Sequence, residues 1–312
     1  MFSWRKIKKP IVGLSPMADY TDSPFSLICK KFGANIIYRE MVSAEALARG
    51  SEKTLKMADF DKKERPIILQ IFGKEPAIMA EAAKILEEKY RPDGIDINMG
   101  CPAKKIISDF NGASLMREPK LAAKIVEAVK AAASAPVSVK TRTGWERETE
   151  ILLFAKIIEE AGADAIAIHG RTKKMGYGGK ANWEIIGKVK SAVKIPVILN
   201  GDVVDCKSFK EAFAISGADG VLIARGALGR PWIFQNIKNR EDMAPSFEEL
   251  KKIILEHAKL HIARYGERGM ITFRKHLAAY FTGFHGAKKM RKKAVRVTNF
   301  EELKIIFKQS AD

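Results

Sequence analysis

The chain has 312 residues, 46% of them hydrophobic, which is enough for a substantial core and argues against wholesale disorder. Lys and Arg (55) outnumber Asp and Glu (37), and the net charge of +18 favours a polyanionic partner, although a Lys-rich solvated surface would explain the same excess. Cys29, Cys101 and Cys206 form no CxxC pair, so we expect no disulfide framework and a reducing cytoplasm. No apolar run is long enough to span a membrane, so we expect no transmembrane segment.

Eight short runs rich in β-branched residues follow one another through the first three quarters of the chain. Helical periodicity separates them and is clearest at 76–90 and 121–133. Strand–helix alternation repeated eight times indicates parallel βαβ units, and eight such units close into a (β/α)8 TIM barrel of the α/β class. The expected strands are 11–17, 35–42, 66–73, 94–100, 136–144, 165–172, 196–203 and 220–227.

The alternation stops near residue 240, and only helical patterns follow. Ser246 and Glu249 form a capping box ahead of one helix, a second helix is expected over 271–284, and Asn299 begins a third. We therefore expect a barrel domain over 1–240 and an all-α helical bundle over 241–312. Residues 264–296 carry ten Lys or Arg and one acid, which favours a phosphate-binding surface over an ordinary solvated helix face. The densest part contains Lys288, Lys289, Arg291, Lys292 and Lys293.

Polar residues end five consecutive strands at one level. Because side chains alternate along a strand, one register points into the barrel and the other packs under the helices. The inward register is polar at Gln70, Asp96, Asn98, Ser138, Lys140, Arg142, His169, Arg171 and Asn200. The outward register is apolar at Ile95, Ile97, Val137, Val139, Ile166, Ile168, Val197 and Leu199. A structural network could satisfy the polar ring, but a planar ligand with polar edges, such as a flavin, would satisfy it better.

Two loops and one thiol complete this expected site. Phosphate is expected between the loops after the last two strands, at Asn200-Gly201-Asp202 and Ala224-Arg225-Gly226. Cys101 follows the fourth strand in a Gly-Cys-Pro turn, which puts its thiol on a loop at the catalytic end of the barrel. A thiol with a pKa of roughly 8.5 is mostly protonated at neutral pH and can act as a general acid.

At this point the residues resemble those of the tRNA-dihydrouridine synthases, and most of all the bacterial B-type subgroup. The similar segments are NMGCP at 98–102, VKTRTG at 139–144, HGRT at 169–172 and NGD at 200–202. SPMADYTDSPF at 15–25, ARGALGRPWIF at 224–234 and RKH at 274–276 extend the resemblance over almost the whole chain. The family usually has glycine where this chain has Ala224.

The resemblance implies an FMN-dependent enzyme that reduces a specific uridine of tRNA to 5,6-dihydrouridine, with NADPH or NADH as the reductant. It implies hydride transfer from flavin N5 to uracil C6 and a proton from Cys101 to C5. Asn98, Arg142 and Arg171 would face the uracil, and the basic helical domain would hold the tRNA. Neither a metal nor a protein partner is implied. The implied FMN contacts are Pro16, Met17, Ala18, Gln70, Lys140, His169, Asn200, Gly201, Asp202, Ala224 and Arg225.

Two other functions stay open on the sequence. FMN barrels that act on free pyrimidines, such as the dihydroorotate and dihydropyrimidine dehydrogenases, share the fold and some share an N-x-x-C-P loop. A barrel retained only as an RNA-binding chaperone would bind tRNA without FMN. For His257 and His261, which lie on an apolar helix stripe, we expect core or interface roles in preference to metal binding.

Overall fold

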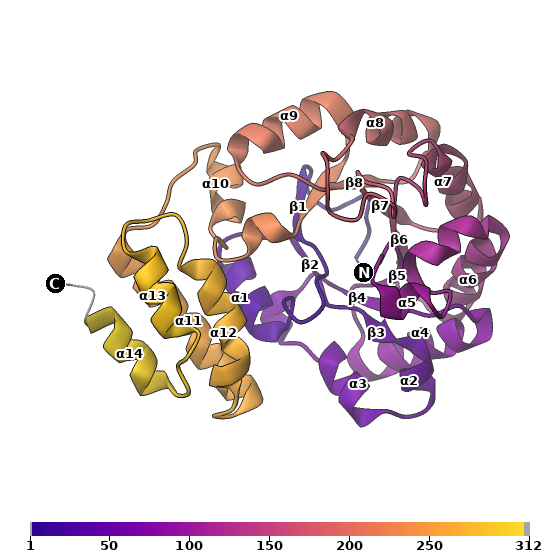
Figure 1. Cartoon of the computed structure of the whole chain (residues 1–312). Coiled ribbons are helices and arrows are strands. Elements are labelled where there is room, and N and C mark those ends of the chain that lie inside the picture. Colours follow the sequence, from indigo (N-terminus) through magenta and orange to yellow (C-terminus); the bar gives the residue numbers. More distant parts are fainter. Residues whose placement is uncertain (1, 309–312) are drawn as a thin grey trace.

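The computed structural model describes residues 2–308, and its main body is a closed parallel barrel surrounded by helices (Figure 1). Each strand pairs in parallel with the next one around the ring, and pairing between β2 and β4 closes it. The predicted (β/α)8 barrel is therefore confirmed. Its strands are β1 (Ile11–Leu14), β2 (Ile36–Tyr38), β4 (Ile67–Phe72), β5 (Gly94–Met99), β6 (Val137–Arg142), β7 (Ala165–His169), β8 (Val197–Asn200) and β9 (Gly220–Ile223).

Helices follow the strands on the outside of the barrel (Figure 1). They are α1 (Ser23–Lys31), α2 (Ala44–Ala48), α3 (Glu52–Ala58), α4 (Pro76–Tyr90), α6 (Pro119–Ala132), α7 (Glu150–Glu160), α8 (Trp183–Ala192), α9 (Cys206–Ser216) and α10 (Ile233–Asn239). The expected strand 35–42 is in fact β2 and a separate short strand, β3 (Val42–Ser43), which pairs with β4. Between β5 and α6 the chain forms α5 (Lys104–Ile107) and a 3-10 segment, Gly112–Arg117.

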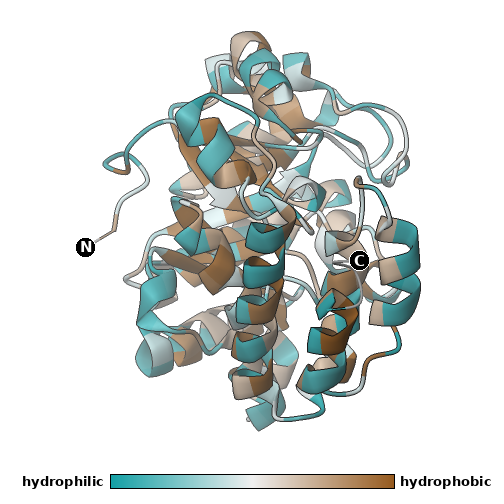
Figure 2. Cartoon of the chain, turned by 90° about the vertical axis from the view of Figure 1, so that its left-hand side faces the viewer, coloured by the Kyte–Doolittle hydropathy of each residue, from teal (hydrophilic) through white to brown (hydrophobic). Residues whose placement is uncertain are grey.

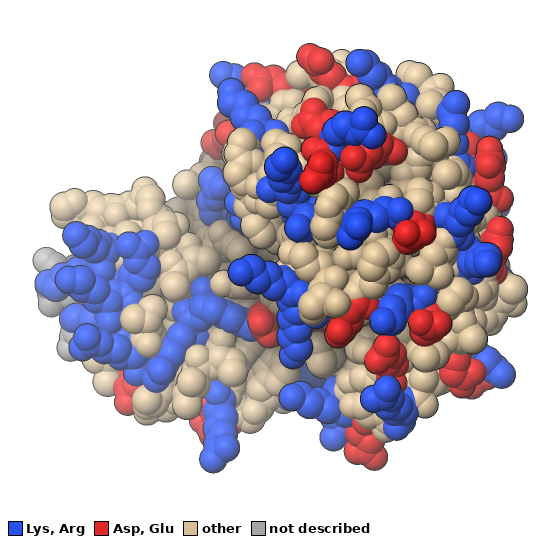
Figure 3. Space-filling view, turned by 45° about the vertical axis from the view of Figure 1, so that its right-hand side comes forward, with Lys and Arg blue, Asp and Glu red and all other residues tan. Residues whose placement is uncertain are grey.

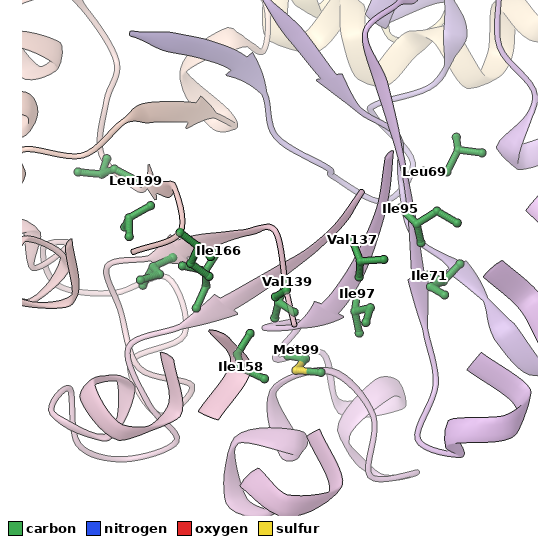
Figure 4. Packing of buried hydrophobic residues seen from close by; sticks show 14 of the residues in the cluster. Leu69, Ile71, Ile95, Ile97, Met99, Val137, Val139, Ile158, Ile166 and Leu199 are labelled. Carbon is green, nitrogen blue, oxygen red and sulfur yellow. The ribbon is translucent and has the colours of Figure 1, made fainter. Parts of the chain in front are cut away.

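The predicted side-chain register is confirmed. The outward residues of the strands are buried under the helices in one apolar cluster, which includes Ile95, Val139 and Ile166 (Figure 4). The inward residues Tyr38, Ala167 and Ile198 form a separate cluster inside the barrel. Trp4, from the segment before β1, joins this inner cluster and is 2% exposed, a contact that the sequence did not reveal.

After α10 the chain forms a helical lobe of α11 (Phe247–Tyr265), α12 (Gly269–Tyr280), α13 (Ala287–Ala294) and α14 (Phe300–Lys308). The capping box of Ser246 and Glu249 begins α11 as expected. The predicted helix 271–284 is wrong at its end, because the chain leaves α12 after Tyr280 and Gly283 adopts a positive φ of 82°. The lobe has its own apolar cluster and packs on α1, and its helices carry hydrophobic residues on their inner faces (Figure 2).

We keep residue 240 as the proposed boundary between the barrel and the lobe, because the apolar clusters on either side of it are separate. Within residues 2–308, no helix combines the length and hydropathy that crossing a bilayer requires.

Candidate active site

A cavity of about 730 Å³ opens at the carboxyl ends of the strands. All eleven residues that the resemblance assigns to FMN line it, together with Asn98, Cys101 and Arg142. Residues that are distant in sequence meet here because parallel strands of a barrel end at the same face. The role of these residues toward a flavin stays a prediction, but the structure brings them together around one cavity.

A hydrogen-bonded network of buried polar side chains forms the floor of the cavity. Asp96 accepts from Gln70 Nε2 at 2.6 Å and from Ser138 Oγ at 2.6 Å. Gln70 Oε1 in turn accepts from Asn98 Nδ2 at 2.9 Å. Burial raises the pKa of Asp96 to about 7, against the opposing effects of these two donors and of the charge on Lys140. The network fixes the amide of Gln70 and leaves Asp96 poised to titrate near neutral pH.

Asn98 also positions the thiol loop. Its Oδ1 accepts from the backbone N–H of Cys101 at 2.9 Å and from that of Gly100 at 3.1 Å. These bonds hold the turn that follows β5 and keep Cys101 at the edge of the cavity. Burial raises the pKa of the Cys101 thiol, although Lys140 and Arg142 nearby act in the other direction. The thiol therefore carries its proton at neutral pH, as a general acid must.

Lys140 is a partly buried cation on the cavity wall. It donates to Asn200 Oδ1 at 3.0 Å, and Asn200 is itself fixed by donating to the carbonyl of Leu222 at 2.7 Å. Burial, assisted by the charge of Arg142, lowers the pKa of Lys140 to about 8. An ammonium has three donors. One faces Asn200, so others remain for the polar edge of a ligand.

The loops after β8 and β9 bring glycine backbone and a cation to one end of the cavity. Gly201 has φ 117°, and a Cβ there would lie 2.9 Å from the ring of His169. A Cβ on Gly226 would lie 2.6 Å from the carbonyl oxygen of Val203. Arg225 is largely exposed at the cavity rim, with its nearest acid, Asp202, 3.9 Å away. Two tight glycine turns beside an exposed guanidinium suit a phosphate group, so this end of the cavity fits FMN.

His169 stands between these loops as a neutral ring. Burial, with the charges of Lys140 and Arg142, holds the pKa of His169 far below its usual range. Its Nε2 lies 3.3 Å from the Nη1 of Arg171. A guanidinium only donates, so Nε2 accepts and the ring carries its proton on Nδ1. His169 can therefore donate a hydrogen bond without adding charge to the site.

Arg171 has different surroundings from those predicted. It is 2% exposed and does not line the cavity. It donates to the carbonyls of Gly178 and Gly179 at 2.9 and 2.7 Å, and to both carboxylate oxygens of Asp202 at 2.8 Å. β7 ends at His169, so strand alternation no longer applies two residues later. This geometry does not favour a contact between Arg171 and a uracil. The Arg171 side chain instead stabilises the loop between β7 and α8.

Arg142 does line the cavity, but its guanidinium also forms hydrogen bonds with the loop between β7 and α8. It donates to the carbonyls of Gly100, Thr172 and Gly176 at 2.8 to 2.9 Å. The loop in turn places Tyr177 on the cavity wall, with its ring centroid 5.5 Å from the guanidinium carbon of Arg142 and 5.3 Å from that of Arg225. The position of Tyr177 could not be predicted from the sequence, because the loop has no periodicity that indicates where its side chains point.

The basic run of the lobe lies on α13, away from the cavity walls. Its side chains Lys288, Lys289, Arg291, Lys292 and Lys293 are exposed and line no part of the cavity. In Figure 3 the Lys and Arg side chains gather over the helical lobe at the left of the view, and a hollow separates that lobe from the barrel. Contact between α13 and a nucleic acid stays a prediction, and the exposed, single-sign surface suits it.

Comparison with solved structures identifies the fold of this molecule, and comparison with sequence relatives identifies its family. The barrel is similar to that of TcOYE with pHBA, with a TM-score of 0.59 at 11% identity over 85% of this chain and 96% of that one. It is similar too to that of a 2-naphthoyl-CoA reductase complex, with a TM-score of 0.57 at 13% identity over 74% of this chain and 50% of that one. At these identities the likeness shows the class of fold alone, a TIM barrel.

The sequence comparisons narrow this class to a family. The family model described as dihydrouridine synthase matches residues 13–311. The chain is 40% identical to a probable tRNA-dihydrouridine synthase of Rickettsia bellii, over 89% of this chain and 87% of that protein. It is also 40% identical to tRNA-dihydrouridine synthase B of Pseudomonas aeruginosa, over 89% and 86%. The chain belongs to the dihydrouridine synthase family, a family of flavin-dependent oxidoreductases. The family membership predicted from the sequence is therefore confirmed.

Proposed function

We propose that this protein reduces a uridine of tRNA to 5,6-dihydrouridine, with FMN as its cofactor and NADPH as the source of electrons. The observation that carries the proposal is that Cys101, with its thiol kept protonated, borders the same cavity as Lys140 and the glycine loops. A hydride donor and a proton donor facing one cavity are what saturation of the uracil C5–C6 bond requires. The relatives' names supply the substrate class.

The residues divide into those that would hold the cofactor and those that would act on the base. Lys140 and Gln70 offer donors to the polar edge of an isoalloxazine ring, and Arg225 with the turns at Gly201 and Gly226 offers a phosphate site. FMN, when bound in its reduced form, supplies the hydride that adds to C6 of uracil. Asn98 fixes the loop that carries Cys101.

Cys101 completes the reduction by giving its proton to C5. The thiolate that remains regains a proton from solvent before the next turnover, so hydride and proton together account for both added hydrogens. A uridine in folded tRNA must leave its stack to enter a cavity in the barrel mouth. The exposed cations of α13 would hold the phosphate backbone while this happens.

The test is a reaction with purified components. The protein, purified with its flavin, is supplied with NADPH and an unmodified tRNA transcript, and dihydrouridine is quantified by mass spectrometry of the digested RNA. We expect dihydrouridine in the tRNA and none from free uracil or orotate. Turnover of a free pyrimidine with none on tRNA would instead support the dehydrogenase alternative. A colourless protein that takes up no FMN but binds tRNA would support the chaperone alternative.

A matched pair of cysteine variants ties the activity to the cavity. Cys101→Ala should keep the flavin and lose turnover, while Cys206→Ala, at the start of α9 and outside the cavity, should keep both. Equal activity in the two variants would remove Cys101 from the reaction.

A further inference from the structure

Four buried side chains from three helices converge where the helical lobe packs on the barrel. They are Asp22, the N-cap residue of α1, His257 and His261 of α11, and His276 of α12. One ring nitrogen or carboxylate oxygen of each lies within 4.8 Å of the corresponding atoms of the other three. None of the four is more than 5% exposed. This cluster lies outside the cavity, and none of its four residues lines it.

Three ring nitrogens of the cluster lack a hydrogen-bond partner among residues 2–308. They are Nε2 of His257, Nδ1 of His261 and Nε2 of His276. Nδ1 of His261 lies 3.3 Å from Asp22 Oδ2, but not in hydrogen-bond alignment. A buried polar group without a partner destabilises the folded protein. Three such nitrogens beside one carboxylate indicate that something binds between them.

The far sides of two of these rings are held by hydroxyl groups. His257 Nδ1 lies 3.1 Å from the Tyr280 hydroxyl, and His261 Nε2 lies 2.9 Å from Thr272 Oγ1. Thr272 already donates its own hydrogen to the carbonyl of Gly269 at 3.0 Å, so its oxygen must accept from His261. His261 therefore carries hydrogen on Nε2, and a neutral ring turns its Nδ1 lone pair toward the carboxylate of Asp22. A lone pair that faces a carboxylate is repelled by it, and either a proton or a metal ion between the two groups relieves this repulsion.

We propose that Asp22, His257, His261 and His276 bind one zinc ion that joins the helical lobe to the barrel. Imidazole nitrogens with one carboxylate are a ligand set that zinc prefers and that Mg²⁺ and Ca²⁺ do not. Four protein ligands, all buried, leave no open position for a substrate, so the site is structural. The hydroxyls on the outer nitrogens of His257 and His261 fix the orientation of both rings, as the outer hydrogen-bond partners of metal-bound histidines do.

The local structure supports this assignment. His257 and His261 are one helical turn apart and so share a face of α11. Ligand atoms around tetrahedral zinc are roughly 3.4 Å apart, so the widest pair must draw in by ~1.4 Å on binding, a shift within reach of side-chain rotation.

The zinc ion would also fix one wall of the cavity. Only Thr21 separates Asp22 from the cavity-lining residue Tyr20, and Thr21 Oγ1 accepts from the backbone N–H of Met17 at 2.9 Å. Tyr20, on the same segment, packs its ring edge-on against His276 at a centroid distance of 5.5 Å. The site therefore connects the orientation of the basic lobe to the position of Met17.

The test is metal binding by the tag-free, full-length protein. The protein is treated with a chelator, dialysed, and titrated with Zn²⁺ alone and in parallel with Co²⁺ alone, whose visible absorption reports tetrahedral coordination. We expect one equivalent of either metal per chain, competition between them, and a higher thermal midpoint in the metal-bound form. Less than one equivalent of zinc, or no tetrahedral cobalt spectrum, in the unaltered protein would overturn the proposal, whatever the variants do.

Variants then locate the site. His276→Gln and Asp22→Asn, the latter of which keeps an N-cap residue for α1, should each lower zinc affinity at least tenfold. His285→Gln changes an exposed histidine of the same lobe and should bind as the unaltered protein does. Unchanged affinity in both cluster variants would show that zinc binds elsewhere. The proposal would also be overturned if protons alone stabilised the cluster. The thermal midpoint would then rise on acidification and would not change when zinc is added.

Discussion

Substituting Asp96 by Asn should change how the stability of the barrel depends on pH. Asp96 is fully buried behind the cavity-lining Gln70, and it accepts from Gln70 and Ser138. Burial raises its pKa from 3.8 to about 7 in the folded protein. In the unfolded chain the carboxyl is ionised at any pH well above 4. Folding therefore takes up a proton at this residue in mildly acidic solution, and the amide of Asn cannot do so.

The sign and size follow from proton linkage. A group whose pKa is raised by folding stabilises the folded state at low pH, and this contribution is lost as the pH rises through the folded pKa. With a folded pKa of about 7, integration from about pH 6 to about pH 8 gives a loss of ~1.4 kcal/mol in the free energy of unfolding. Relative to the unaltered protein, Asp96→Asn should therefore gain ~1.4 kcal/mol of stability over that interval.

The assay is urea unfolding of the flavin-free proteins at the two pH values, because a bound cofactor would add its own linkage. Buried histidines such as His169 add their own pH dependence, but they are common to both proteins and cancel in the difference. Asp109→Asn, at an exposed position, controls for the change in net charge. Parallel pH profiles for the unaltered protein and Asp96→Asn would refute the reasoning, and so would a difference of the same size in Asp109→Asn.

Three other changes test the site and the lobe. Cys101→Ala should leave FMN and tRNA binding intact and slow dihydrouridine formation by about 10²- to 10⁴-fold, the usual range for loss of a general acid; a rate within a few-fold of the unaltered protein would contradict it. Lys140→Met keeps the aliphatic stem and should weaken FMN binding by about 10- to 100-fold in a fluorescence titration, because it removes a charged donor; unchanged affinity would show that Lys140 does not face the cofactor. Lys289→Ala with Lys292→Ala should weaken tRNA binding and lower the slope of log affinity against log salt by about 0.7 for each phosphate that the variant no longer neutralises; an unchanged slope would place the tRNA elsewhere.

The strand register could be predicted because it depends on local alternation. Ile95 and Asp96 are neighbours that must face opposite sides of β5, and in a barrel one of those sides is the interior. The same alternation, with the rule that barrel strands end at one face, brings Gln70, Lys140 and Asn200 to one cavity. These features need no knowledge of the loops.

Other features depend on contacts that alternation cannot supply. Arg171 lies beyond the end of β7, where the loop between β7 and α8 decides its partners, and Tyr177 reaches the cavity only because that loop folds over Arg142. His257 and His261 fit an apolar stripe well enough to be read as core residues. Their meeting with Asp22 depends on how the lobe packs on α1, which no pattern in the sequence encodes.

The central claim is that the cavity at the barrel mouth reduces a uridine in tRNA. The most direct measurement is mass spectrometry of tRNA from cells that lack this gene, and from the same cells supplied with the gene or its Cys101→Ala form. The account predicts that one tRNA position loses the two hydrogens of dihydrouridine, regains them with the unaltered gene, and does not regain them with the variant. An unchanged set of dihydrouridines in the cells without the gene, or full restoration by Cys101→Ala, would contradict it.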